Sequence, residues 1–361
     1  MQDLLQIIGD DGAPDERWEP DLTREQLHAL YRHMSLERHL DQRMLSLQRQ
    51  GRIGFYGPAL GQEAVVVGGA FAMRTQDWIF PQYRESGAAL LRGMPLRIMI
   101  AQFMGNADDP AKGRQMPCHY TWREGRFMSI SSVVGPRITQ AAGTAWAAKI
   151  RGDDTAVLVY FGDGATSTAE FHQGMNFAGV YGAPIVFLCN NNQYAISVPF
   201  SRQTAAKSVA VKARAYGFDG HRVDGMDALA VYRAVHDACL KAHEGGGPTL
   251  VEALTYRLGP HSSSDDPSRY RPEGELDTWS KRDPLDLMRK YLLHKGLWSP
   301  EEETHLTEAL EAEISVAIKE AEAAPLPRIE TLFEDLYAVT PPNLVEQRED
   351  TLKTHREIRR A

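Results

Sequence analysis

Short apolar runs that alternate with helix-forming stretches constrain the fold of this chain more than any other feature of its sequence. The middle of the chain contains four such runs, each bounded by Gly, Pro or Asp, at residues 156–161, 184–189, 221–223 and 249–256. Strands that alternate with helices are typical of a parallel sheet with helices on both faces. The sequence therefore predicts an α/β fold with a doubly wound, mostly parallel sheet.

Helix signals flank this central region on both sides. Thr23 is placed to cap a helix, with Gln26 three positions later, and apolar residues then recur at helical spacing over residues 27–47. A second start signal at Ser299 precedes a helix that is expected to stop before Pro325. Its apolar stripe consists of Leu306, Leu310, Ile314 and Ile318.

The length of 361 residues fits one large core with helical additions. We expect an N-terminal arm over residues 1–22 and an α/β domain over residues 23–285. Residues 286–361 are expected to form a helical C-terminal extension and tail of the same unit.

The composition excludes several classes of protein. The hydrophobic fraction is 43%, and no apolar run approaches the roughly 20 residues of a membrane helix, so a membrane-spanning chain is not expected. A net charge of −8 argues against nucleic acid as a partner, because phosphate binding requires a basic surface. The one basic cluster is interpreted as a solvated helix end and consists of Lys353, Arg356, Arg359 and Arg360.

The cysteines indicate a reducing compartment. Cys118, Cys189 and Cys239 are widely spaced and form neither a disulfide framework nor a zinc motif. The acidic N-terminal segment resembles neither a mitochondrial presequence nor a secretory signal. We therefore expect a cytoplasmic bacterial protein or a processed organellar one.

Two polar motifs follow two of the expected strands. Gly162-Asp163-Gly164 comes after the first strand and Asn191-Asn192 after the second, so both lie at the carboxyl edge of the sheet, where such sheets bind ligands. The Asp163 carboxylate and the Asn192 amide oxygen suit Mg²⁺, with diphosphate oxygens completing its coordination. Gly162 and Gly164 allow close approach of a phosphate, and a helix beginning near Ser167 directs free N–H groups at it.

A dinucleotide site and a purely structural turn are the alternative interpretations of these motifs. The dinucleotide pattern requires a third glycine after Gly164, which is missing, and an acid at the end of the next strand, where Asn190 stands instead. A structural turn would explain Asp163 alone, but it does not explain the two motifs together.

The span from Gly162 to Asn192, about thirty residues, resembles the thiamin diphosphate motif. Residues 171–178 and 194–197 also resemble alpha subunits of branched-chain 2-oxoacid dehydrogenases, and the similarity extends over residues 41–279. The resemblance implies the thiamin-diphosphate-binding fold, with thiamin diphosphate and Mg²⁺ as cofactors.

The resemblance also assigns ligands by position. It implies that Mg²⁺ is bound by Asp163, Asn192 and the carbonyl of Tyr194. It also implies diphosphate contacts for Gln82, Arg84, Gly164 and Ala165. It places Tyr83 near the cofactor ring, and it implies aminopyrimidine contacts for Ser132 and Val134.

This chain departs from the branched-chain pattern at two places. Asn190 stands where those relatives have an arginine bound to phosphate, which removes a charged contact. Pro136 and Arg137 stand where relatives use a threonine and a glutamine to bind potassium. Our hypothesis is that the Arg137 guanidinium replaces the ion by bonding loop carbonyls and hydroxyls.

A polar loop over residues 259–266 follows the last expected strand. His261 in this loop matches the family histidine that reaches the cofactor and helps transfer the acyl group, and Ser262 matches a serine phosphorylated in mitochondrial relatives. His261 could instead join His119, His172 and Asp265 in a metal-dependent hydrolase, but these residues lack a recognisable ligand spacing. A non-catalytic scaffold is a third interpretation.

The resemblance implies the alpha subunit of a 2-oxoacid dehydrogenase complex. Such a chain assembles as two alpha and two beta subunits, with a beta-subunit glutamate that activates the cofactor, and passes the acyl group to a lipoyl acyltransferase core. Within this family, residues 194–197 and 263–266 resemble the branched-chain members, which implies oxidative decarboxylation of a branched-chain 2-oxoacid, with pyruvate or acetoin as the alternative substrate.

Overall fold

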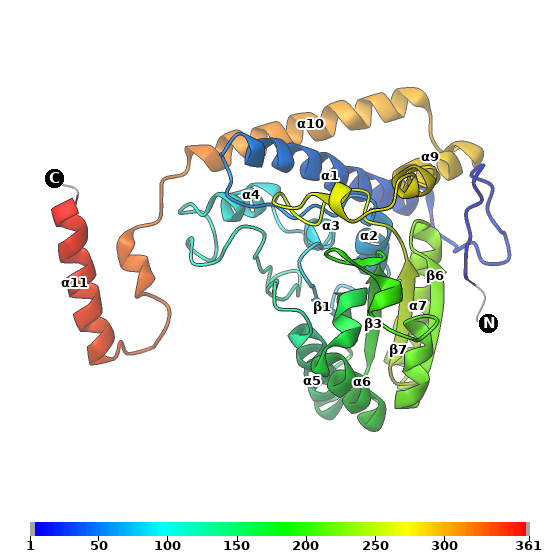
Figure 1. The fold of residues 1–361 in the computed structure, drawn as a ribbon, viewed down its shortest axis with the longest axis horizontal. Coiled ribbons are helices and arrows are strands. Elements are labelled where there is room, and N and C mark those ends of the chain that lie inside the picture. Colours follow the sequence, from blue (N-terminus) through cyan, green and yellow to red (C-terminus); the bar gives the residue numbers. More distant parts are fainter. Residues whose placement is uncertain (1–3, 359–361) are drawn as a thin grey trace.

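The computed structural model describes residues 4–358 and is built around a parallel sheet (Figure 1). The sheet has five strands, and each strand pairs in parallel with its neighbours. Their order across the sheet is β1 (Trp78–Phe80), β2 (Val157–Gly162), β3 (Ile185–Asn191), β7 (Thr249–Leu254) and β6 (Asp219–Asp224). The predicted fold class and its four strands are confirmed, whereas the sequence analysis missed the three-residue edge strand β1.

Helices cover both faces of the sheet, because alternate strand residues enter two separate apolar cores. In β2, Leu158 and Tyr160 pack into one core, whereas Val157, Val159 and Phe161 pack into the other. The first core contains α1 (Arg24–Arg49), α2 (Glu63–Phe71) and α7 (Ala228–His243). The second contains α5 (Pro136–Arg151) and α6 (Ala169–Tyr181).

The expected helix starts are confirmed at both ends of the domain. Thr23 and Gln26 form a capping box at the start of α1. Ser299 accepts a hydrogen bond from the backbone N–H of Glu302 at the start of α10 (Pro300–Ala323). This helix ends before Pro325, and its buried stripe includes Leu310, Ile314 and Ile318, while Leu306 is only partly buried.

Shorter elements connect these layers. They are α3 (Ser86–Leu91), α4 (Leu96–Met104), α8 (Glu275–Ser280), α9 (Pro284–His294), β4 (Tyr194–Ala195), β5 (Val198–Pro199), and the 3₁₀ helices η1 (Asp163–Ser167), η2 (Phe200–Arg202), η3 (Ala210–Tyr216), η4 (Pro267–Arg269) and η5 (Ile329–Leu332). Among them, η1 and β4 matter most for function, because they follow β2 and β3 directly at the carboxyl edge of the sheet.

The N-terminal segment packs against the sheet, whereas the C-terminal helix does not. In the N-terminal segment, Leu5 forms a parallel bridge with Val223 of the edge strand β6, and the Asp227 carboxylate accepts hydrogen bonds from the N–H groups of Ile7 and Ile8. The helix α11 (Pro342–Ile358) instead stands apart from the body (Figure 1) and contains no buried residue. Arg359 and Arg360 of the basic cluster lie outside the described residues.

Two further expectations concern the whole chain. Within residues 4–358, no helix is long and apolar enough to cross a membrane. The three cysteines are free, as the sequence analysis predicts, and all three are buried.

Candidate functional site

A cavity lies at the carboxyl edge of the sheet, where β1, β2, β3 and β7 end. All the residues for which the sequence predicts a cofactor or metal contact line it, namely Gln82, Tyr83, Arg84, Ser132, Val134, Asp163, Gly164, Ala165, Asn192, Tyr194 and His261. Parallel strands end at a common edge, so tertiary folding gathers segments that are up to 179 positions apart, from Gln82 to His261.

Asp163 is the acidic centre of this cavity. It begins η1, directly after β2, and is 1% exposed. Its carboxyl accepts hydrogen bonds from the Gln203 side chain and from the Asn192 backbone amide. Burial raises the pKa of Asp163 to about 6, against these hydrogen bonds and the nearby Arg257 charge, which lower it. A buried carboxylate of this kind favours a bound cation.

The turn after β3 presents two more oxygens to the same region. The Asn192 Nδ2 group donates to Gln62 Oε1 at 2.9 Å, while Oδ1 accepts the backbone N–H of Tyr194 at 3.3 Å and keeps a second lone pair for a ligand. Gln193 has a φ of 74°, a left-handed conformation rare for a side chain other than glycine. This turn brings the amide of Asn192 and the carbonyl of Tyr194 back toward the end of β2.

Gly164 is required for the close approach of two segments. A Cβ at Gly164 would lie 2.8 Å from the Cβ of Ala195, too close for two carbon atoms. The helix expected near Ser167 begins slightly later, because η1 comes first and Thr168 caps α6 by accepting the N–H of Phe171. The cap residue Thr168 lines the cavity, so α6 begins beside it.

The segment that follows β1 holds the polar loop in place. The Arg84 guanidinium donates to the carbonyl of Pro58 and, at 2.8 Å, to the carbonyl of His261. Gln82 donates to the carbonyl of Ser131 at 3.4 Å, and its buried Oε1 has no hydrogen-bond partner. The Tyr83 ring stands edge-on to the His261 ring, with centroids 6.1 Å apart. Gln82 therefore keeps an acceptor free for a ligand, whereas Arg84 is largely engaged within the protein.

His261 is held as a neutral ring with a defined tautomer. Arg84 lies 3.0 Å from Nδ1 and can only donate, so Nδ1 accepts and the ring proton sits on Nε2. Burial, followed by the charges of Arg84 and Arg257, lowers the pKa of His261 to about 3. The Asp265 carboxylate accepts the backbone N–H of His261 at 2.7 Å and fixes the loop.

The hydrolase alternative finds no support in this arrangement. His172 contacts the hydroxyl of Tyr216, and Asp265 binds the backbone of its own loop. Neither residue lines the cavity that contains His119 and His261. Across residues 4–358, these four side chains do not form a group close enough to share a metal ion.

The loop that carries Ser132 and Val134 forms the more exposed wall of the cavity. Ser132 Oγ lies 2.6 Å from His119 Nε2, while His119 Nδ1 lies 3.0 Å from the carbonyl of Pro117. The carbonyl can only accept, so the ring proton is on Nδ1 and the serine hydroxyl donates to Nε2. Arg137 turns toward this loop and donates to the carbonyl of Ile130 at 3.2 Å. That contact agrees with the carbonyl part of the Arg137 hypothesis, whereas no loop hydroxyl is bonded.

Arg257 is a charged cavity residue that the sequence analysis missed. It is 1% exposed, and it donates to the carbonyl of Tyr194 at 3.3 Å and to the carbonyl of Ile196 at 2.8 Å, while its Nε has no hydrogen-bond partner. Asn190, by contrast, is buried away from the cavity lining. Arg257 therefore supplies positive charge in a region where Asn190 provides none. The sequence could have indicated Arg257 as a site residue, because it lies just after β7, at the carboxyl edge of the sheet.

Comparison with known proteins identifies the family. The sequence model described as "Dehydrogenase E1 component" matches residues 31–330. The chain is 44% identical to the pyruvate dehydrogenase E1 component subunit alpha of Staphylococcus aureus strain Mu50, over 96% of this chain and 92% of the relative. Proteins of the same name from S. aureus strain MRSA252 and from Staphylococcus epidermidis are each 43% identical over the same shares. The chain thus belongs to the dehydrogenase E1 component family, as the alpha subunit of a thiamin-diphosphate-dependent 2-oxoacid dehydrogenase.

Proposed function

We propose that this chain is the alpha subunit of a pyruvate dehydrogenase E1 component. The observation that carries the proposal is the 44% identity to proteins of that name, which extends over 96% of the chain. The branched-chain substrate expected from the sequence motifs has no support among these relatives, and the pyruvate alternative fits better.

The motifs that suggested a branched-chain substrate have another physical explanation. In the polar loop, the Asp265 carboxylate accepts hydrogen bonds from the His261 backbone and, at 2.6 Å, from the Tyr270 hydroxyl. In the segment of residues 194–197, the Tyr194 hydroxyl donates to Glu275 at 2.7 Å. Both motifs therefore maintain the loops around the cofactor cavity, and they do not report the size of the substrate's side chain.

The residues of the cavity fit a magnesium diphosphate. Asp163, the Oδ1 of Asn192 and the carbonyl of Tyr194 form an all-oxygen set, which Mg²⁺ prefers. In this proposal Arg257 takes the phosphate contact that Asn190 cannot provide, because a guanidinium bonds phosphate oxygens through charged donors. Gly164 and Ala165 line the same wall, where the absence of a side chain at Gly164 lets the backbone approach the diphosphate. The unpartnered Oε1 of Gln82 can only accept a hydrogen bond, so it suits a donor group of the ligand and not a diphosphate oxygen.

The cofactor and the protein divide the chemistry between them. When bound, thiamin diphosphate supplies the carbanion that attacks the 2-oxo carbon and the ring that takes up electrons as carbon dioxide leaves. The chain's own residues orient the reactants and manage protons. His261 is neutral, with its proton on Nε2, so it is suited to donate a hydrogen bond or that proton during acyl transfer. Tyr83 and Arg84 hold the ring in this orientation.

The proposed assembly contains two alpha and two beta chains and delivers its acyl group to a lipoyl acyltransferase. Asp163 is the single carboxylate among the described residues that line the cavity, so no acid of this chain remains to bind the pyrimidine half of the cofactor. A beta subunit would supply that acid across an interface. The three free, buried cysteines agree with a reducing compartment, and we propose a cytoplasmic location.

Substrate comparison with the assembled enzyme tests this function. The chain is purified with its beta partner, and kcat/KM is measured with an artificial electron acceptor on pyruvate, 3-methyl-2-oxobutanoate and acetoin. We expect pyruvate to give the highest value, and Asp163→Ala in the same assembly to abolish activity. A preference for 3-methyl-2-oxobutanoate would overturn the substrate proposal, and full activity of the chain without any beta subunit would overturn the shared site.

A further inference from the structure

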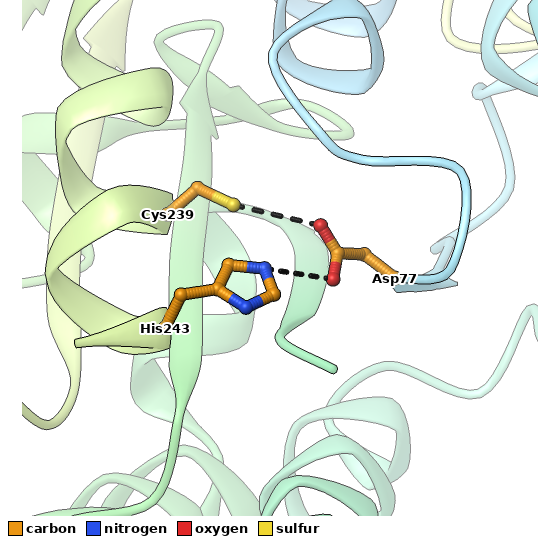
Figure 2. Close-up of side chains that lie close together, drawn as sticks. All are labelled: Asp77, Cys239 and His243. Carbon is orange, nitrogen blue, oxygen red and sulfur yellow. Dashed lines mark hydrogen bonds and ion pairs between the residues drawn. The ribbon is translucent and has the colours of Figure 1, made fainter. Parts of the chain in front are cut away.

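Asp77, Cys239 and His243 form a second polar cluster, at the opposite edge of the sheet from the cavity. Asp77 directly precedes β1, and Cys239 and His243 stand four positions apart on one face of α7 (Figure 2). One ligand atom from each residue lies within 4.8 Å of the others. None of the three residues lines the cavity, so the cofactor site does not account for this cluster.

One ring nitrogen of His243 lacks a hydrogen-bond partner, and its surroundings favour a bound cation. Its Nδ1 lies 2.9 Å from Asp154 Oδ1, so in a neutral ring Nδ1 carries the proton and Nε2 carries a lone pair. That Nε2 lies 3.0 Å from Asp77 Oδ1 but has no hydrogen-bond partner, and the side chain is 5% exposed. A lone pair that faces a carboxylate oxygen is repelled unless a positive charge lies between them.

The three ligand types and their surroundings match a zinc site. Thiolate, imidazole and carboxylate are the usual zinc ligands, and three of them leave a fourth position for water. A zinc-bound histidine commonly donates its other N–H to a carboxylate, which is the place of Asp154 here. The Asp77 oxygens also accept the backbone N–H groups of Ala156 at 2.9 Å and Arg74 at 2.8 Å, so this carboxylate is fixed in orientation.

We propose that Asp77, Cys239 and His243 bind a Zn²⁺ ion and that Asp154 positions His243 for this purpose. The Cys239 thiol donates to Asp77 Oδ2 at 3.5 Å, and zinc binding replaces its S–H bond by an S–Zn bond, with the proton released to solvent. A surface hollow lined by His243, Asp154 and Gly245 gives the ion an access route.

We assign this ion to fold stability and not to the reaction, because none of its three ligands lines the cofactor cavity. It joins the end of α7 to the residue before β1, the short edge strand whose carboxyl end leads to Gln82, Tyr83 and Arg84. Zinc therefore stabilises the edge of the sheet from which one wall of the cofactor cavity begins, without contacting the cofactor. Because it binds the folded chain, zinc raises the thermal midpoint as its concentration rises above the Kd.

Cobalt substitution tests the proposal directly. The full chain, assembled with its partner, is freed of metal with a chelator and titrated with Co²⁺, which reports a bound thiolate through a near-ultraviolet charge-transfer band. We expect one such site per chain. Cys239→Ser and His243→Gln remove the band, whereas the matched variants Cys118→Ser and His236→Gln keep it. Asp154→Asn keeps the band but weakens zinc affinity by roughly 10- to 100-fold.

Two results would overturn the zinc site. Absence of a thiolate band in the wild-type protein would mean that no metal is bound and that His243 carries a second proton, on Nε2, which faces Asp77. A band that survives in Cys239→Ser would place the metal on another cysteine. If that variant does not fold, the substitution Asp154→Asn at an exposed position provides the test. Unchanged zinc affinity in Asp154→Asn would contradict the proposal that Asp154 positions His243.

Discussion

The substitution Asp163→Asn separates two effects of this carboxylate: the destabilisation of the fold by a buried charge, and the binding of the cofactor. Burial raises the pKa of Asp163 from 3.8 to about 6, so ionisation destabilises the metal-free fold. A shift of about 2 units corresponds to ~3 kcal/mol. Because the folded pKa is the higher one, the cost is absent below about pH 4, grows up to about pH 6 and is complete above it.

The variant is therefore expected to be more stable than wild type in chelator, by up to ~3 kcal/mol at about pH 8 and by roughly half of that at about pH 5. Thermal and urea unfolding of the metal-free chain measure this difference. Asp219→Asn serves as the control, since Asp219 is 75% exposed at the other side of the sheet, and we expect no change there.

The same substitution is expected to abolish magnesium-dependent binding of thiamin diphosphate, because a neutral amide replaces the one carboxylate that residues 4–358 contribute to the cavity. In wild type, affinity falls about tenfold from pH 8 to pH 5, since a group one unit below its pKa is about one-tenth ionised. Calorimetry of the assembled enzyme measures both effects. Equal stability of variant and wild type at about pH 8, or a pH-independent wild-type affinity, would refute the reasoning.

Three further substitutions test the rest of the cavity. His261→Ala is expected to retain cofactor binding and most decarboxylation with an artificial acceptor but to lose transfer to a lipoyl domain, and equal loss in both assays would contradict its role in acyl transfer. Arg257→Met is expected to weaken cofactor binding at least about tenfold, measured by calorimetry, since a charge-assisted phosphate bond is lost. Unchanged affinity would mean that other residues bind the phosphate. Gly164→Ala is expected to cost about 1–3 kcal/mol of stability and to weaken cofactor binding, because its Cβ would lie 2.8 Å from the Cβ of Ala195. Ala195→Gly is expected to rescue the variant in part. Lack of any effect would show that the turn can move.

The proposed substrate rests on similarity over the whole chain and not on local motifs. Tyr194 and Asp265 belong to segments that resemble branched-chain enzymes, yet both hydrogen-bond within the loops that frame the cofactor. Residues that maintain a shared cavity are similar among enzymes with different substrates. Similarity over 96% of the chain is therefore the better guide to the substrate.

Periodicity and local motifs were sufficient to predict the fold class. Apolar runs of strand length and the cap at Thr23 depend only on neighbouring residues, so four strands and the first helix follow directly from the sequence. The strand β1, of three residues, is too short for a periodic signal, and only its pairing with β2 reveals it.

The sequence also located the cavity, because polar residues that follow parallel strands meet at one edge of the sheet. It could not reveal which side chains face one another across that edge. Arg257 contacts the carbonyl of Tyr194, 63 positions away, and Arg84 sets the tautomer of His261, 177 positions away. The group of Asp77, Cys239 and His243 likewise spans 162 to 166 positions, because one loop and one helix meet only after the sheet has formed. Local propensity and spacing determined the elements and the edge at which the site lies, whereas contacts between distant residues, and the charges and burial they create, were decided by tertiary packing alone.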